Sequence, residues 1–215
     1  MNCLPGILLF VLFIVRSGAQ PLPVWQLETT FQGKPIILGK TYYMESLQDS
    51  ITMDEFRFYV SKLRWLNASG ELIETANEFH LFDAADSASQ HLQFTAGIPE
   101  NAHYLEFHIG IDSLTQTAGV RGGALDPSRG MYWAWQSGYI QMKLEGHTPV
   151  CHSRKNRFQF HLGGYLPPFQ TLQTLRIPIR DRSQVKLHIP MDQLLRVLPL
   201  TTLCEVMSPR AEAVQ

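Results

Sequence analysis

The stretch GGALDPSRGMYWAWQSGYIQMKLEG, from Gly122 to Gly146, gathers aromatic residues between two turns marked by glycine. In an extended strand, successive side chains point to opposite faces, so Trp133 and Trp135 are expected side by side on one face, with Tyr132 on the other. Packing is the simplest explanation of such a pair, because aromatic strand residues usually fill a core. The alternative is that one of these electron-rich rings takes part in chemistry at a nearby site.

Alternating segments with turn residues between them extend in both directions from this stretch. One segment, from Tyr104 to Ile111, places its leucine, phenylalanine and isoleucine side chains on a single face. The pattern is typical of antiparallel sheets that have one covered face. Similar segments are found at 24–31, 36–43, 56–65, 80–82, 91–94, 131–136, 139–144, 157–162, 172–179 and 185–189.

The expected fold class is all-β, because no segment is long enough to form the helix of a βαβ unit. Each sheet must cover its apolar face against another layer, so we expect an antiparallel β-sandwich of roughly eight to ten strands. Near the C-terminus, leucines recur at helical spacing as far as Leu198. Asp192 is a candidate cap for one short C-terminal helix there.

A long glycine-rich connection, from Asp112 to Gly130, joins two of the expected strands. A connection of this length without structure of its own is usually functional or mobile. Asp112 and Asp126 invite a calcium hypothesis, but the dense run of oxygen ligands that this ion requires is missing from the sequence. We therefore interpret both aspartates as turn formers.

The N-terminus has the features of an export signal in residues 1–19. A short apolar run from Leu8 to Val15 is followed by small residues of the kind that signal peptidase requires, and we predict cleavage after Ala19. The run is too short for a membrane span, and no later segment is long enough to cross a bilayer. We expect a periplasmic or secreted protein in which residues 20–215 form a single domain.

The charge and cysteine content narrow the classes of partner. The formal net charge is −1 and the sequence has no basic cluster, so we expect neither nucleic-acid binding nor adhesion to anionic lipid. Cys151 and Cys204 remain after removal of the leader, and in an oxidising compartment they are candidates for pairing. Closure of this loop of about fifty residues would stabilise the fold by about 4 kcal/mol on a chain-entropy estimate.

Two near-repeats, EFHIG at 106–110 and QFHLG at 159–163, place His108 and His161 on the face opposite their apolar neighbours. If the two strands were neighbours in register, the imidazoles would stand with Cβ atoms about 5 Å apart and could share one metal ion. The alternative is that both histidines are ordinary solvent-facing strand residues.

Other chemical motifs give weaker signals. His147, Cys151 and His152 offer ligand types that suit copper and zinc, but their spacing matches no structural zinc pattern and a disulfide would remove the thiolate. The sequence has no G-x-S-x-G elbow, P-loop, H-E-x-x-H or dinucleotide fingerprint. No nucleophile or acid–base pair can be assigned by spacing, so we expect a protein that is not an enzyme.

Four motifs, in order along the chain, resemble the MbnP-like domain family of exported bacterial proteins. They are GIDS from Gly110, the aromatic stretch from Gly123, FHLGGY from Phe160 and VMSP from Val206. The aromatic stretch is the most specific of them, and the resemblance covers most of the mature chain. It implies a compact β-sandwich, in agreement with the strand pattern.

The resemblance also implies a copper site. Members of the family resemble proteins that bind Cu(I) through two histidines and an oxidised tryptophan. In those proteins a partner dihaem cytochrome peroxidase-like protein has converted the tryptophan to kynurenine. Carried over by motif, W-x-W gives Trp133 and Trp135, and FHLG gives His161. The second histidine has no match by motif, because the loop expected to hold it reads LTQ at 114–116, and His108 is the nearby substitute.

Two functions follow for testing. The first is an exported copper-binding protein for copper handling or storage, with His161, His108 and an oxidised Trp133 or Trp135 as ligands of Cu(I). The alternative is a metal-free periplasmic or cell-surface binding module of the same fold. In that case the aromatic strand is core, and the glycine-rich connection presents the binding surface.

Overall fold

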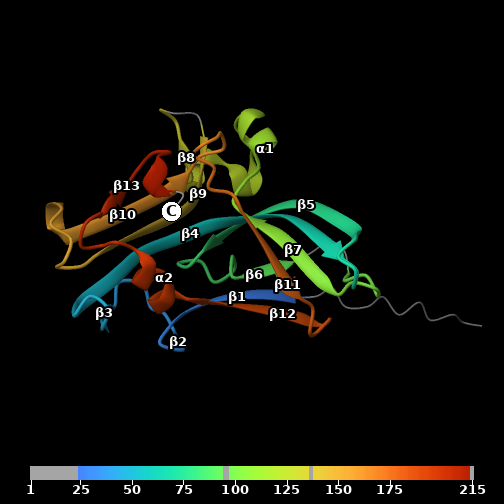
Figure 1. The fold of residues 1–215 in the computed structure, drawn as a ribbon, viewed down its shortest axis with the longest axis horizontal. Helices are drawn as coiled ribbons and strands as arrows, with labels where there is room; N and C mark the ends of the chain where they lie inside the picture. Colours follow the sequence, from blue (N-terminus) through green and yellow to red (C-terminus); the bar gives the residue numbers. More distant parts are fainter. Residues whose placement is uncertain (1–23, 94–96, 136–137, 214–215) are drawn as a thin grey trace, which may run out of the picture.

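The computed structural model describes residues 24–93, 97–135 and 138–213, and the predicted signal sequence in residues 1–19 lies outside them. Within this part of the chain the fold is mostly β, as predicted, with the strands in two packed sheets (Figure 1). The strands are β1 (Val24–Phe31), β2 (Lys34–Pro35), β3 (Thr41–Met44), β4 (Asp49–Leu66), β5 (Leu72–Asp83), β6 (His91–Gln93), β7 (Tyr104–Ile109), β8 (Tyr132–Trp133), β9 (Gly138–His147), β10 (Arg157–Gly163), β11 (Gln173–Pro178), β12 (Gln184–Pro190) and β13 (Glu205–Val206).

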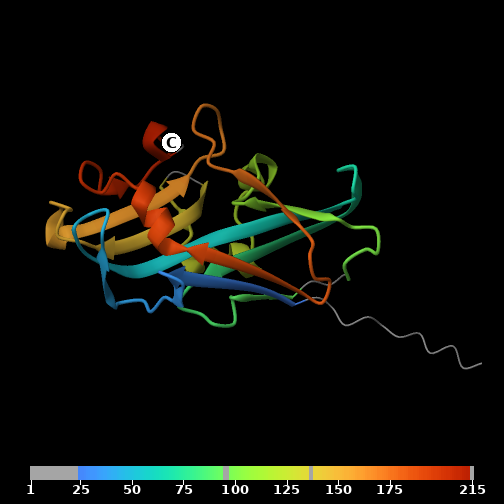
Figure 2. The ribbon, with the colours of Figure 1, turned by 60° about the horizontal axis from the view of Figure 1, so that its bottom comes forward.

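The two sheets differ in size. The larger sheet has the strand order β11-β7-β4-β9-β10-β13, with β3 and β5 paired to β4 and β8 paired to β9. The smaller sheet has the order β12-β1-β2, with β6 paired to β1. In both views β1 and β12 lie side by side below the larger sheet, whereas β8 and the helix that follows β7 stand on its other side (Figures 1 and 2). The expected sandwich is confirmed.

Two details of the strands go beyond the sequence pattern. The described residues form 13 strands, more than the eight to ten expected, in part because β2 and β13 are two residues long and too short to show alternation. The strand expected at 131–136 is shorter than predicted and is present as β8. Most strand pairs are antiparallel, but β1 pairs with β12 and β10 pairs with β13 in parallel. The sandwich is therefore mixed in direction, since alternation along one strand does not record the direction of its neighbour.

Strand β4 holds the larger sheet together, because it pairs with β3, β5, β7 and β9 along its 18 residues. Its register shifts between Ser61 and Leu63, where Lys62 adopts a positive φ of 51°. Such a bulge adds one residue to a strand, so the alternation of faces shifts by one residue after it. Leu63 and Trp65 thereby rejoin the main core on the face that covers the smaller sheet.

The main core lies between the two sheets and is rich in aromatic rings. Trp25 of β1 meets Trp65 of β4 edge to face, with ring centroids 6.1 Å apart, and meets Phe107 of β7 at 6.2 Å. All three side chains are buried. Edge-to-face contacts of this kind are the preferred geometry of aromatic pairs and add to the burial of their apolar area.

The glycine-rich connection contains short helices, so the expectation that it lacks structure of its own is wrong. They are α1 (Ser113–Thr117), η1 (Gly123–Leu125) and η2 (Pro127–Arg129). Asp112 caps α1 by accepting a hydrogen bond from the Thr115 amide at 2.9 Å, and Asp126 accepts one from the Ser128 amide at 2.9 Å. Helices of three to five residues are too short to give a helical period in the sequence.

The predicted C-terminal helix is present as α2 (Met191–Val197), and it buries Met191 and Leu195. Its N-cap is Pro190, so Asp192 is not the cap; the carboxylate lies in the first turn, where it is favourable to the helix dipole. Two further short helices are η3 (Arg154–Asn156) and η4 (Ala211–Ala213). Among the described residues, no helix combines the length and apolar character needed to cross a membrane.

The two cysteines that follow the predicted signal sequence form a disulfide. Cys151 and Cys204 are bonded, with their Cα atoms 5.9 Å apart and a separation of 53 positions in the sequence. The bond ties the loop after β9 to the segment that leads into β13. It also removes the Cys151 thiolate from any metal site with His147 and His152.

A test of the sheet packing is Gly146→Ala. A methyl group at this position in β9 would overlap the carbonyl oxygen of Thr52 and the ring of Phe158. We expect a loss of stability of about 1–3 kcal/mol, because overpacking forces the surrounding structure to shift. Urea unfolding measures it, and Gly122→Ala is the matched control, since a methyl group at Gly122 meets no atom within 4 Å. Equal midpoints for the two variants would contradict the packing described here.

Candidate functional site

The candidate site lies on the outer face of the larger sheet, the face that does not cover the smaller sheet. Phe158 and Phe160 of β10 point into the main core, so His161 and Gly163 point outward. On the neighbouring strand β9, Lys143 stands opposite His161, and Glu145 stands opposite Gln159. The outer face of β9 and β10 is therefore lined by polar side chains.

His161 is buried in this polar layer, with 6% of its surface exposed. Its Nε2 atom lies 2.8 Å from Oε1 of Glu145. Glu145 also contacts two cations, Arg157 at 2.7 Å and Lys143 at 3.3 Å, and accepts a hydrogen bond from Nε2 of Gln159 at 3.3 Å. Lys143 also lies 3.0 Å from Glu55 of β4. Charges of both signs alternate across the layer, so the buried carboxylate is paired as a buried charge must be.

The pKa shifts fix the protonation of this pair. Burial lowers the pKa of His161 more than the hydrogen bond to Glu145 raises it, so the imidazole is neutral at neutral pH. Burial alone would raise the pKa of Glu145, but the hydrogen bond from His161 and the charge of Lys143 lower it further, so the carboxylate is ionised. An ionised carboxylate only accepts hydrogen bonds, so the single proton of the ring is on Nε2.

The other ring nitrogen of His161 is consequently a lone-pair donor. Nε2 is engaged by Glu145, and no described residue forms a hydrogen bond with Nδ1. Histidines that bind metals commonly donate their second N–H to a carboxylate, which fixes the tautomer and the orientation of the ring. His161 is held in this way by Glu145, with Nδ1 as its available atom.

Trp133 is placed on the same face by a glycine. A Cβ atom at Gly163 would lie 2.6 Å from Cζ3 and 2.8 Å from Cη2 of the Trp133 ring, so the indole occupies the space that a side chain would fill. Gly163 is two residues beyond His161 on β10, and alternate residues of a strand share a face. The indole of Trp133 therefore packs on the same face of β10 that carries His161.

The indole of Trp133 packs in a second, smaller cluster outside the main core. Only 5% of its surface is exposed. Its neighbours are apolar residues of β4 and β9 and of the glycine-rich connection with the residue at either end of it: Tyr59, Ile111, Leu125, Met131, Tyr139 and Ile140. Its Nε1–H is buried and has no hydrogen-bond acceptor among the described residues. An unpaired buried donor costs about 1–3 kcal/mol, so packing alone does not explain a tryptophan at this position.

Trp135 lies next to Trp133 but is exposed. The two ring centroids are 5.9 Å apart, as expected for a neighbouring pair, with the planes tilted by 45°. Strand β8 ends at Trp133, and Trp135 stands in the turn that follows, with 68% of its surface exposed. The packing interpretation holds for Trp133 alone, because only that ring is enclosed.

His108 lies in a different part of the larger sheet. Its strand, β7, is separated from β10 by β4 and β9. Three strand spacings amount to roughly 14 Å, too far for two imidazoles to bind one ion directly. Burial, followed by the charge of Lys62, lowers the pKa of His108, and its Nδ1 atom is buried without a partner. The near-repeats at 106–110 and 159–163 are not neighbouring strands.

The described residues contain no group of three or more histidine, cysteine, aspartate and glutamate side chains arranged to hold a metal ion. His147 is instead paired with Asp54 at 3.2 Å. The sequence pattern did not single out Glu145, Lys143 or Gly163. Their positions next to His161 could be predicted only if the register of β9 against β10 were known.

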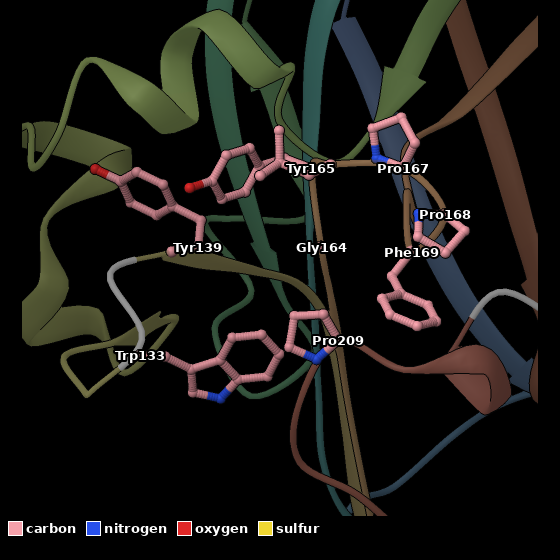
Figure 3. Close-up of a pocket in the computed structure, with 10 residues that line it drawn as sticks. Trp133, Tyr139, Gly164, Tyr165, Pro167, Pro168, Phe169 and Pro209 are labelled. Carbon is pink, nitrogen blue, oxygen red and sulfur yellow. The ribbon is translucent and has the colours of Figure 1, made fainter.

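A cleft of about 370 Å³ opens beside Trp133 (Figure 3). Its aromatic walls are Trp133, Tyr139, Tyr165 and Phe169, and prolines from the turn after β10 and from the C-terminal segment complete it. Figure 3 shows the rings of Trp133, Pro209 and Phe169 around one part of the cleft and Tyr139 with Tyr165 on another side. No charged side chain of the described residues lines it.

Comparisons with known proteins agree with this architecture. No curated protein matches the chain. The chain is similar in structure to MbnP from Methylosinus trichosporium, with a TM-score of 0.50 and 17% sequence identity over 79% of this chain and 75% of that chain, a likeness of fold. A family model described as MbnP matches residues 24–207. This match spans both sheets and the face that carries His161 and Trp133, and the chain therefore belongs to the MbnP family.

Proposed function

We propose that this protein is an exported, non-enzymatic copper-binding protein that handles or stores Cu(I), with His161 and an oxidised Trp133 as ligands. The observation that carries the proposal is the free Nδ1 atom of a neutral, carboxylate-oriented His161 on the face that Trp133 covers. Membership of the MbnP family supports it. Export is supported by the apolar run and the small residues that follow it in residues 1–19.

The donor set suits copper as cargo. Neutral imidazole is a good ligand for copper, and the burial of His161 limits the access of water to the ion. In the tryptophan itself the indole N–H is a donor with no lone pair to offer, so Trp133 is not a ligand as the chain is synthesised. His161 then supplies the one ready nitrogen of the site.

Oxidation would turn Trp133 into the second ligand. Two equivalents of hydrogen peroxide, the oxidant of a peroxidase-like partner, would add two oxygen atoms across the C2–C3 bond of the indole, break that bond and leave as two waters. Hydrolysis of the resulting N-formyl group by one further water releases C2 as formate, which leaves an aniline nitrogen and a ketone. The partner that we propose for this step is a dihaem cytochrome peroxidase-like protein. Trp133 is the better substrate of the pair for this purpose, because it covers the strand of His161, whereas Trp135 points out of the turn.

His108 is not part of the proposed site. Two strands lie between it and His161, so the geometry leaves a single histidine beside Trp133 among the described residues. The same observation favours a second candidate function, a metal-free binding module of the same fold. In that function the ligand would enter the uncharged cleft beside Trp133.

Copper titration of His161→Ala tests the assignment. We expect the affinity for Cu(I) to fall by at least about tenfold, because a ligand is lost where even outer partners are worth 10- to 100-fold. His108→Ala is the matched control and should bind as the unsubstituted protein does. The titration is made on protein produced beside its dihaem partner, and intact mass shows whether a tryptophan has been converted. Equal affinity in the two variants would remove His161 from the site.

The pH dependence of copper binding should follow His161. Its pKa lies below the ordinary value of 6.5, so Nδ1 stays unprotonated as the pH falls through 6.5 and the affinity should hold there. At more acidic pH the proton competes with the ion and the affinity should fall. Titration of the His161 ring carbons by NMR gives the pKa directly. Loss of affinity that begins above pH 6.5 would contradict this assignment.

A further inference from the structure

The cleft beside Trp133 has walls that are fixed by the backbone. Gly164 has a φ of 136°, and a Cβ atom there would overlap the carbonyl oxygen of Phe169. The backbones of Gly164 and Phe169 are therefore in direct contact. The carbonyl of Gly164 accepts hydrogen bonds from Nε2 of Gln141 at 3.0 Å and from the amide of Thr171 at 3.2 Å. These contacts hold the cleft open without a ligand.

The turn that carries Phe169 is also closed by its own backbone. The amide of Phe169 donates to the carbonyl of Leu166 at 2.9 Å. Prolines occupy both positions between them and have no amide hydrogen to offer to a ligand. On the opposite wall, Gly163 admits the ring of Trp133 against β10. Both glycines of the FHLGGY motif therefore position a wall of the cleft.

The chemistry of the walls selects a neutral ligand. No charged side chain lines the cleft in the described part of the chain, so an ion would be desolvated there without a partner. The Tyr139 hydroxyl is already engaged, since it donates to the carbonyl of Leu125 at 3.1 Å and accepts from the amide of Arg121 at 3.0 Å. Flat aromatic and proline rings remain as the contact surface.

The size and position of the cleft suit a small molecule. Its volume of about 370 Å³ falls within the range of small-molecule pockets, roughly 300–1,000 Å³. The rim is apolar and uncovered, with Leu166 exposed, and Trp135 is exposed next to the wall residue Trp133. Apolar side chains left open to water around a preformed cleft are typical of a binding site.

We propose that this cleft binds a flat, neutral, aromatic small molecule of about two fused rings, with Trp133, Pro209 and Phe169 among its walls. The site rests on the binding-module role; it shares Trp133 with the copper proposal, but His161 and Glu145 are not among its walls. A ligand in the cleft would also cover Trp133 on the side away from β10.

Isothermal titration calorimetry with three related probes tests the ligand class. 2-Naphthol is flat and neutral, 2-naphthoate is flat and anionic, and decahydro-2-naphthol is neutral but not flat. We expect saturable binding of 2-naphthol, with each of the other two at least about tenfold weaker, because a charge lacks a partner and a puckered ring loses the aromatic contacts. Equal binding of all three, or none by 2-naphthol, would overturn the proposal.

Variants of the wall locate the binding. Phe169→Ala should weaken the binding of 2-naphthol by about threefold to tenfold, the value of one aromatic contact. Leu175→Ala, at an exposed position on β11, is the control and should leave it unchanged. Thermal unfolding of each variant separates a lost contact from a lost fold. A folded Phe169→Ala protein that binds 2-naphthol as well as the control would overturn the site.

Copper titration of the same Phe169→Ala variant separates the two proposals. We expect its affinity for Cu(I) to stay unchanged, because Phe169 is not among the proposed ligands. His161→Ala should in turn bind 2-naphthol normally. If Phe169→Ala kept both its affinity for Cu(I) and its binding of 2-naphthol, the assignment of the cleft would be wrong while the copper proposal would still stand on His161.

Discussion

The indole of Trp133 lies where the side chain of residue 163 would be, and the outer face of the larger sheet is organised around that contact. Any side chain at position 163 would displace the ring, and the apolar cluster over β4 and β9 would lose its largest member. The same contact fixes where the cleft begins and which strand the indole covers. The absence of a side chain at Gly163 thus allows the Trp133 cluster to pack against the strand that carries His161.

The two faces of the larger sheet differ in chemistry. The inner face buries aromatic and aliphatic side chains against the smaller sheet, and it needs no polar partners. The outer face is buried only in part, so it accommodates an imidazole, a carboxylate and several cations in one paired layer. The neutral form of His161 follows from that layer, since burial disfavours the imidazolium and Glu145 remains the charged partner. The proposed site therefore lies on the outer face.

The alternating pattern in the sequence was sufficient to predict the β-sandwich and the C-terminal helix, because each depends on short-range periodicity. Trp133 and Trp135 lie close together, but the strand expected at 131–136 ends at Trp133 and Trp135 stands in the turn, so alternation along one strand does not account for the pair. Cys151 and Cys204 were candidates for pairing, and the structure shows the bond between them. Strand order does not follow from periodicity. His108 and His161 lie in nearly identical motifs, yet β4 and β9 separate them, and only the topology shows this.

The part of the site that the sequence could not give is the set of contacts between strands. Glu145 is 16 residues from His161 in the chain, and it becomes a partner only through the register of β9 against β10. The burial of Trp133 and the exposure of Trp135 likewise depend on where β8 ends. Each of these features is a property of pairing and chain reversal, which residue type and spacing leave open.

Burial keeps His161 neutral, and the hydrogen bond to Glu145 places its proton on Nε2, which leaves Nδ1 as a free ligand atom on the face of β10 that Trp133 covers. Nitrogen-detected NMR of the imidazole, on the copper-free protein at neutral pH, tests this arrangement. We expect a neutral ring protonated at Nε2, and a loss of this single tautomer in Glu145→Gln. A ring that is protonated at Nδ1, or that carries a positive charge at neutral pH, would contradict it.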